Sequence, residues 1–175
     1  MKRSKFLLKA GAGVGAAIST LMLSNNIFKQ AGEIKIIKNG AGRKLNVIGD
    51  QMTFKLTGED TNGQYVLIEQ NNEPGIGIPM HVHENEDEVF RVIEGELEMQ
   101  VGDKKVILGK GDIAFCPRGI PHTWKVTGSK KARVDLSFYP AGLELMFEEL
   151  AKLPAGPPDL AKVSQITEKY GVKFV

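Results

Sequence analysis

From about residue 33 onward, the chain is divided into short β-prone runs that are separated by tight-turn sequences. Turn pairs such as Asn62-Gly63 and Gly102-Asp103 recur between runs rich in Val, Ile, Leu and aromatic residues. These runs predict strands at 33–37, 44–48, 52–56, 64–69, 79–83, 88–93, 96–101, 105–108, 112–116, 123–126 and 132–139. Many short strands at regular spacing are typical of a β-sandwich or β-barrel, so the predicted fold class is all-β.

The segment 141–175 has a helical pattern instead. Apolar residues recur at helical spacing from Leu143 to Leu153, and Pro154 ends the pattern. A second helix is predicted over 159–170, and we expect both helices to pack against the sheet or across a dimer. The chain is therefore divided into a leader (1–32), a β-barrel (33–140) and a C-terminal helical extension (141–175).

The first 32 residues have the pattern of an export leader. They hold five basic residues and no acid, and residues 10–28 carry no charge. The alternatives are an amphipathic helix or a membrane anchor, although the Gly and polar residues of this stretch make a poor spanning helix. The start resembles a twin-arginine leader, except that Lys2 replaces the first arginine and one extra residue precedes Phe6. We expect Sec or twin-arginine-like export to the bacterial periplasm or cell envelope, with no stable membrane span in the mature form.

The charge balance and the cysteine count exclude several classes of protein. The chain has 23 basic and 21 acidic side chains, a net charge of +2. Without the leader, 18 basic groups face 21 acidic ones, so the remaining domain carries about −3. This balance gives no reason to expect a nucleic-acid partner, and a small molecule is the expected ligand. One cysteine permits neither an internal disulfide nor a zinc site built on several thiolates.

The three histidines of the chain fall into one pattern. His81 and His83 are two apart on a predicted strand, so their side chains project from the same face. Glu88 begins the next strand, and His122 begins a later one after Pro121. A lone histidine usually has a packing role, but three imidazoles and one carboxylate form a natural ligand set for a divalent transition metal. We therefore predict His81, His83, Glu88 and His122 as ligands of one metal ion.

At these residues the sequence resembles the cupin superfamily. The first cupin motif matches at every spacing, with Gly75, His81, His83, Glu88 and Gly95. The second matches at Gly111, Pro117, Gly119 and His122, while Val126 stands where an asparagine is usual. The resemblance covers about residues 43–150 and implies a cupin jelly-roll β-barrel. It implies no single reaction, because cupins include enzymes, ligand sensors and storage proteins.

A narrower likeness is to bacterial monocupins that are often grouped with quercetin 2,3-dioxygenases. It rests on the run 58–63, on Glu86-Asp87-Glu88 after the histidine pair, and on Pro140-Ala141-Gly142 before Phe147-Glu148-Glu149-Leu150. This resemblance implies a homodimer and a centre of three histidines and one glutamate. It also implies that Glu88 is both a ligand and the proton acceptor from the substrate hydroxyl.

The residues beside the predicted ligands suggest a substrate pocket. Phe90 and Trp124 share a strand face with Glu88 and His122, and they are the candidate substrate-binding residues, with packing in the barrel core as the alternative. Cys116 is interpreted as a small buried hydrophobe. The acids in 84–87 are interpreted as a solvated turn, although one of them could support a ligand histidine.

Two classes of function remain open. The first is a metal-dependent dioxygenase, an oxidoreductase acting on a small aromatic or enolic substrate that Glu88 deprotonates. The second is a non-catalytic envelope cupin that binds a metal or small ligand, or a non-redox isomerase-like cupin. The first class is favoured by bound iron, manganese, nickel, cobalt or copper, and the second by bound zinc. We expect one of the first five metals rather than zinc. The motifs contain no second acid–base pair, which counts against an isomerase.

Overall fold

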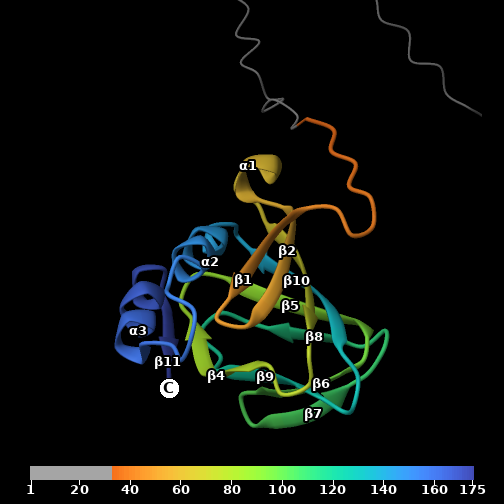
Figure 1. The fold of residues 1–175 in the computed structure, drawn as a ribbon, viewed down its shortest axis with the longest axis vertical. Coiled ribbons are helices and arrows are strands. Elements are labelled where there is room, and N and C mark those ends of the chain that lie inside the picture. Colours follow the sequence, from red (N-terminus) through yellow and green to blue (C-terminus); the bar gives the residue numbers. More distant parts are fainter. Residues whose placement is uncertain (1–32) are drawn as a thin grey trace, which may run out of the picture. The chain divides into compact units, whose positions relative to one another are not determined.

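Two antiparallel β-sheets make up the body of the protein in a computed structural model, which describes residues 33–175 (Figure 1). The predicted export leader lies outside these residues. The six-stranded sheet has the order β1 (Arg43–Val47), β2 (Asp50–Leu56), β3 (Val66–Asn72), β10 (Ala132–Tyr139), β5 (Asp87–Glu94) and β8 (Ile113–Cys116). The five-stranded sheet has the order β11 (Val172–Phe174), β4 (Gly77–His83), β9 (His122–Thr127), β6 (Glu96–Val101) and β7 (Lys104–Leu108).

The core lies between the two sheets and follows from the alternation along each strand. In β10, every second residue from Ala132 to Phe138 is buried, and the residues between them are only partly buried. On β3, Val66 and Ile68 are fully buried, and they meet β10 across the register pairs with Phe138 and Leu136. The predicted all-β fold class and its jelly-roll architecture are confirmed.

One predicted strand is wrong. Residues 33–37 alternate apolar and polar side chains, yet they pair with no strand among the described residues. Ile34 is 93% exposed and Ile36 is 80% exposed, so the run has no buried face. β-Propensity becomes a strand only where a neighbouring strand accepts its hydrogen bonds and a core covers one face. Here a side-chain contact holds the run instead, since Lys35 Nζ donates to Asp60 Oδ2 at 2.7 Å.

The C-terminal segment forms the two predicted helices and then an additional strand. Helix α2 spans Leu143–Leu150, and α3 spans Leu160–Lys169. Asp159 caps α3, because its side chain accepts hydrogen bonds from the backbone N–H groups at positions 161 and 162. The chain then turns at Gly171, and the unpredicted strand β11 pairs with β4. The C-terminal segment therefore completes the five-stranded sheet.

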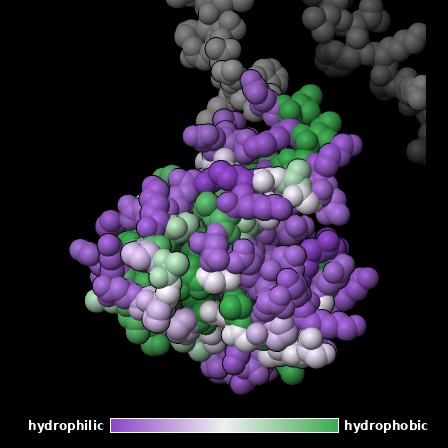
Figure 2. All heavy atoms as spheres, viewed as in Figure 1, coloured by the Kyte–Doolittle hydropathy of each residue, from purple (hydrophilic) through white to green (hydrophobic). Residues whose placement is uncertain are grey.

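The helices lie on one side of the sheets in Figure 1, and a short helix, α1 (Gly58–Thr61), follows β2. Figure 2 shows apolar atoms where this helical side meets the sheets, among mostly hydrophilic side chains on the face drawn. Within the described residues, no helix combines the length and the apolar character that crossing a membrane requires.

Candidate metal centre

Three strands, two from the five-stranded sheet and one from the six-stranded sheet, bring the four predicted ligands together. His81 and His83 come from β4, Glu88 from β5 and His122 from β9. His81 lies directly opposite His122 in the register of β4 and β9. All four residues are 1–3% exposed, and each offers one ligand atom that lies within 4.8 Å of the other three. A buried cluster of this composition could bind one metal ion.

Backbone carbonyls orient two of the imidazole rings. Nδ1 of His81 lies 3.0 Å from the Pro79 carbonyl, and Nδ1 of His122 lies 3.1 Å from the Ile120 carbonyl. Because a carbonyl can only accept, each Nδ1 carries the proton and donates it. The Nε2 atom of each neutral ring then keeps its lone pair, which is the form that binds a metal.

The remaining polar atoms of the cluster fit a cation. Nε2 of His122 lies 2.7 Å from Glu88 Oε2, and Nε2 of His83 lies 3.5 Å from the same oxygen. Neither ring nitrogen of His83 has a hydrogen-bond partner within residues 33–175. Buried polar atoms without partners cost free energy unless something satisfies them. A divalent ion shared by these lone pairs would satisfy them together.

The electrostatics of the cluster support neutral imidazole at His81. Burial lowers the pKa of His81 to about 4, and the neighbouring His122 and His83 lower it further against the opposing effect of Glu88. Burial also acts to lower the pKa of His122, but the hydrogen bond and negative charge of Glu88 outweigh it and raise that pKa. The negative charge of Glu88 therefore stabilises positive charge on its neighbours in this site.

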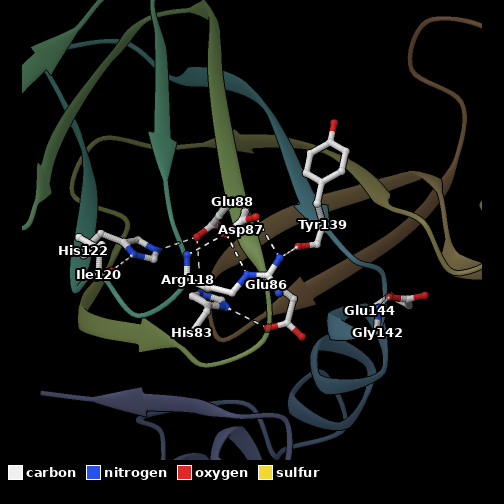
Figure 3. Close-up of polar contacts among 10 residues, drawn as sticks. All are labelled: His83, Glu86, Asp87, Glu88, Arg118, Ile120, His122, Tyr139, Gly142 and Glu144. Atoms are coloured by element: carbon white, nitrogen blue, oxygen red, sulfur yellow. Dashed lines mark hydrogen bonds and ion pairs between the residues drawn. The ribbon is translucent and has the colours of Figure 1, made fainter.

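The acidic turn before Glu88 is only partly a solvated turn. Asp87 accepts two hydrogen bonds from the Arg118 guanidinium, at 3.1 and 2.9 Å, which lower its pKa to about 2 (Figure 3). Glu86, by contrast, is buried, and its Oε2 lies 3.6 Å from Nδ1 of His83. The turn therefore places the Glu86 carboxylate beside the predicted ligand His83. The sequence pattern had left open whether one of these acids supports a ligand histidine.

A cavity of about 480 Å³ opens onto the cluster. His81, His83 and Glu88 line it directly. Its walls are mostly apolar and come from the barrel, from α2 and α3, and from β11, including Leu136, Phe138, Met146, Phe147, Val163, Val172 and Phe174. Sequence reasoning missed this contribution of the C-terminal segment, because nothing in a helical spacing pattern says which cavity the helix covers.

The two predicted pocket residues occupy different positions. Trp124 lines the cavity. Phe90 is fully buried and lies behind it, with its ring 6.4 Å from Trp124 and 6.5 Å from His122 between centroids. Cys116 is buried opposite Glu88 on β8, and burial followed by the charge of Glu88 raises its thiol pKa to about 12. A thiol with such a pKa is inert at neutral pH.

Sequence reasoning also missed two polar residues in the cavity wall, Asp50 and Gln70. Asp50 begins β2 and Gln70 lies on β3, where an inward-facing position of a barrel strand is normally apolar. Neither residue belongs to a recognisable motif. A polar residue in phase with buried Val66 and Ile68 was the signal that could have indicated Gln70.

The fold and the site together define a jelly-roll protein with a candidate metal centre of three histidines and one glutamate. Residues 68–139 match the family model of the cupin domain. The chain therefore carries a cupin domain over these residues.

Known proteins resemble the chain over part of its length. Quercetin 2,3-dioxygenase of Bacillus subtilis (strain 168) is 27% identical over 92 residues, which are 52% of this chain and 27% of that protein. This chain thus spans about a quarter of the curated relative it matches.

Among solved structures, KdgF from Halomonas sp. has a TM-score of 0.56 at 19% identity, covering 65% of this chain and 99% of that one. A predicted oxalate decarboxylase from Thermotoga maritima has a TM-score of 0.55 at 20% identity, covering 61% and 99%. At these identities the structural likeness shows the fold.

Proposed function

We propose that this metal-binding cupin is a metal-dependent dioxygenase that acts on a small aromatic or enolic substrate, as in quercetin 2,3-dioxygenase. One observation carries the proposal: Glu88 belongs to the ligand cluster and also lines an apolar cavity of about 480 Å³. A carboxylate in both places can meet the metal and an acidic hydroxyl of the substrate. The partial likeness to the Bacillus subtilis enzyme supports the same reaction.

The four clustered side chains would hold one divalent ion. We expect that ion to be iron, manganese, nickel, cobalt or copper rather than zinc. Such an ion would supply Lewis-acid polarisation of a substrate oxygen and redox chemistry with dioxygen. Because a dioxygenase places both oxygen atoms in the product, the reaction needs no external reductant.

The residues of the chain would activate and enclose the substrate. Glu88 accepts the proton of the enolic or phenolic hydroxyl, which leaves an electron-rich anion. The apolar wall at Trp124, Leu136 and Phe138 packs against the flat faces of the ring and excludes water from the anion. Burial keeps His81 neutral at neutral pH, in the form that can bind a metal.

Oxygen consumption tests this proposal. The protein is loaded in turn with iron, manganese, nickel, cobalt and copper, and oxygen uptake is followed with quercetin and with a panel of catechols and enols. We expect uptake with at least one metal and its loss in Glu88→Gln. No uptake under any metal loading would remove the dioxygenase assignment.

A non-redox cupin is the second candidate, and one observation favours it. Asp50 places a second titratable group in the cavity of Glu88, which the motifs alone do not contain. Two acid–base groups at opposite ends of one cavity could each exchange a proton with a long substrate, without dioxygen. Tightly held zinc in the purified protein, with no oxygen uptake, would favour this candidate or a non-catalytic binding role.

Export and dimer formation are further proposals. The basic, then apolar, segment 1–32 supports export to the periplasm or cell envelope by a Sec or twin-arginine-like route. The resemblance to bacterial monocupins supports a homodimer. Fractionation of cells that express the full chain would test the first proposal, and light scattering on the purified protein would test the second.

A further inference from the structure

A polar cluster of two buried amides and one half-buried carboxylate lies at the start of β2 and the end of β3. Asp50 accepts a hydrogen bond from Gln70 Nε2 at 2.6 Å and another from Asn72 Nδ2 at 2.7 Å. Asn72 in turn accepts the backbone N–H of Gln51 through its Oδ1 at 2.7 Å. Gln70 is 1% exposed and Asn72 is 2% exposed. Polar groups at such depth are normally hydrogen-bonded throughout.

One atom of this cluster is not satisfied. Gln70 Oε1 is buried and has no hydrogen-bond partner in the part of the chain that the structure describes. Its orientation is determined by its neighbour, because a carboxylate can only accept and so the amide nitrogen must face Asp50. The carbonyl oxygen of the amide is thereby left as a free acceptor. A group that binds there must donate a hydrogen bond.

Asp50 and Gln70 both line the cavity of the metal centre, whereas Asn72 stands behind them. In the sheet register, Glu88 on β5 lies opposite Phe138 on β10, which in turn lies opposite Val66 on β3. Gln70 lies four residues beyond Val66 along β3. Four residues of a strand span roughly 13 Å. The cavity wall between these two levels includes the apolar residue Leu136, which lies opposite Ile68 on β3. The cavity therefore has a polar group at each end and an apolar middle.

We propose that Asp50 and Gln70 form a second recognition site in this cavity, which binds a hydroxyl group at the far end of the substrate. The inference rests on the proposed function and names its substrate class: an elongated aromatic molecule with a metal-binding oxygen at one end and a hydroxyl donor at the other. Gln70 Oε1 accepts the donor, and Asp50 holds the Gln70 amide in the orientation that this requires.

The charge of Asp50 is consistent with this role. Burial raises the pKa of Asp50 to about 6, with a further raising effect from the charge of Glu88 and against the lowering effect of the two amide hydrogen bonds. At pH 7 and above the carboxylate is therefore mostly ionised. A negative carboxylate beside Gln70 further favours a ligand group that donates a hydrogen bond. The alternative role is purely structural, in which the cluster only fixes β2 against β3, and binding measurements can separate the two roles.

Six probes that differ at three positions provide the test: flavone, 3-hydroxyflavone, and each of these with one distal hydroxyl at the 4′ or at the 7 position. The 3-hydroxyl reports on the metal, and the distal hydroxyl reports on Gln70. Dissociation constants are measured by fluorescence titration at pH 8 on the zinc-loaded protein, where no turnover can consume the probe. We compare the wild type with Gln70→Met, which has similar volume and no acceptor, and with the control Ser164→Ala, which removes another polar group from the same cavity wall.

In the wild type we expect a distal hydroxyl, at one of the two positions, to tighten binding about tenfold, the usual effect of one buried hydrogen bond. The gain should disappear in Gln70→Met and persist in Ser164→Ala. Equal affinity with and without the distal hydroxyl in the wild type would overturn the inference, and this comparison needs no variant to fold. A gain that survives in Gln70→Met, with a melting temperature near that of the wild type, would also overturn it.

The same measurements separate this inference from the proposed function. If the 3-hydroxyl does not tighten binding but the distal hydroxyl does, recognition by Gln70 stands and substrate binding at the metal fails. If only the 3-hydroxyl tightens binding, the metal site stands and the second recognition site fails.

Discussion

The Nε2 atom of His122 lies 2.7 Å from Oε2 of Glu88, although the opposite nitrogen of that ring already donates to the Ile120 carbonyl. A neutral ring with its proton on Nδ1 presents only a lone pair to the carboxylate. Two acceptors at this distance require a positive charge between them or a proton on one of them. The contact thus marks the place where the candidate centre most needs a cation.

Removal of a ligand should therefore remove the metal. We expect His81→Ala and His122→Ala to lower bound metal well below one equivalent per chain, because each variant leaves three ligands and an opened cavity in place of four. Elemental analysis after dialysis measures the stoichiometry. Cys116→Ala is the matched control, since Cys116 lies opposite Glu88 in the sheet without belonging to the cluster. Full metal content in both histidine variants would contradict the ligand assignment.

The carboxylates of the site should differ in their effects on catalysis. Glu88→Gln keeps a ligand oxygen but cannot accept a proton, so we expect kcat to fall at least about 100-fold, in the range typical of a lost general base. Glu86→Gln changes only the carboxylate that lies 3.6 Å from His83 Nδ1, and we expect a smaller loss of kcat, about 10-fold, together with weaker metal binding. Kinetics and metal content are measured on both variants. Equal losses of kcat would mean that Glu88 has no separate role as a base.

The sequence predicted the parts of this protein that depend on local pattern. Strand alternation predicted the two sheets, and the spacing of His81, His83, Glu88 and His122 placed all four at one point of the barrel, where the structure has them. The wrong strand at 33–37 shows the limit of this reasoning, since pairing depends on a neighbour that local pattern does not specify.

The rest of the site depends on contacts between distant segments. The cavity wall combines β2, β3 and the C-terminal helices, whose residues are far apart in the chain. Gln70 could not be assigned from the sequence, because its environment comes from Asp50, a residue 20 positions away. In a barrel, the phase of a strand predicts which side chains point inward but not what they meet there.

The glycines of the two cupin motifs should be needed to different degrees. Gly95 has a φ of +79°, and a Cβ atom there would lie 2.5 Å from the Lys131 carbonyl oxygen. Gly119 has a similar φ of +76°, but a Cβ there would meet nothing within 4 Å. Gly119→Ala should cost about 1–2 kcal/mol of unfolding free energy from backbone strain alone. Gly95→Ala should cost more, because the backbone must also shift, and urea denaturation of the two variants measures the difference.

Asp50 should make the stability of the protein depend on pH. Its folded-state pKa of about 6 lies above the ordinary aspartate value of 3.8, so the folded state binds its proton more tightly. This contribution is fully present below pH 3.8 and is lost as the pH rises to about 6, in total on the order of 3 kcal/mol. Asp50→Asn cannot lose a proton. The unfolding free energy of the variant minus that of the wild type should therefore increase from pH 4 to pH 6 and then level off, as urea denaturation at each pH would measure. A difference that stays flat or decreases over this range would show that the buried carboxylate is not destabilised by ionisation.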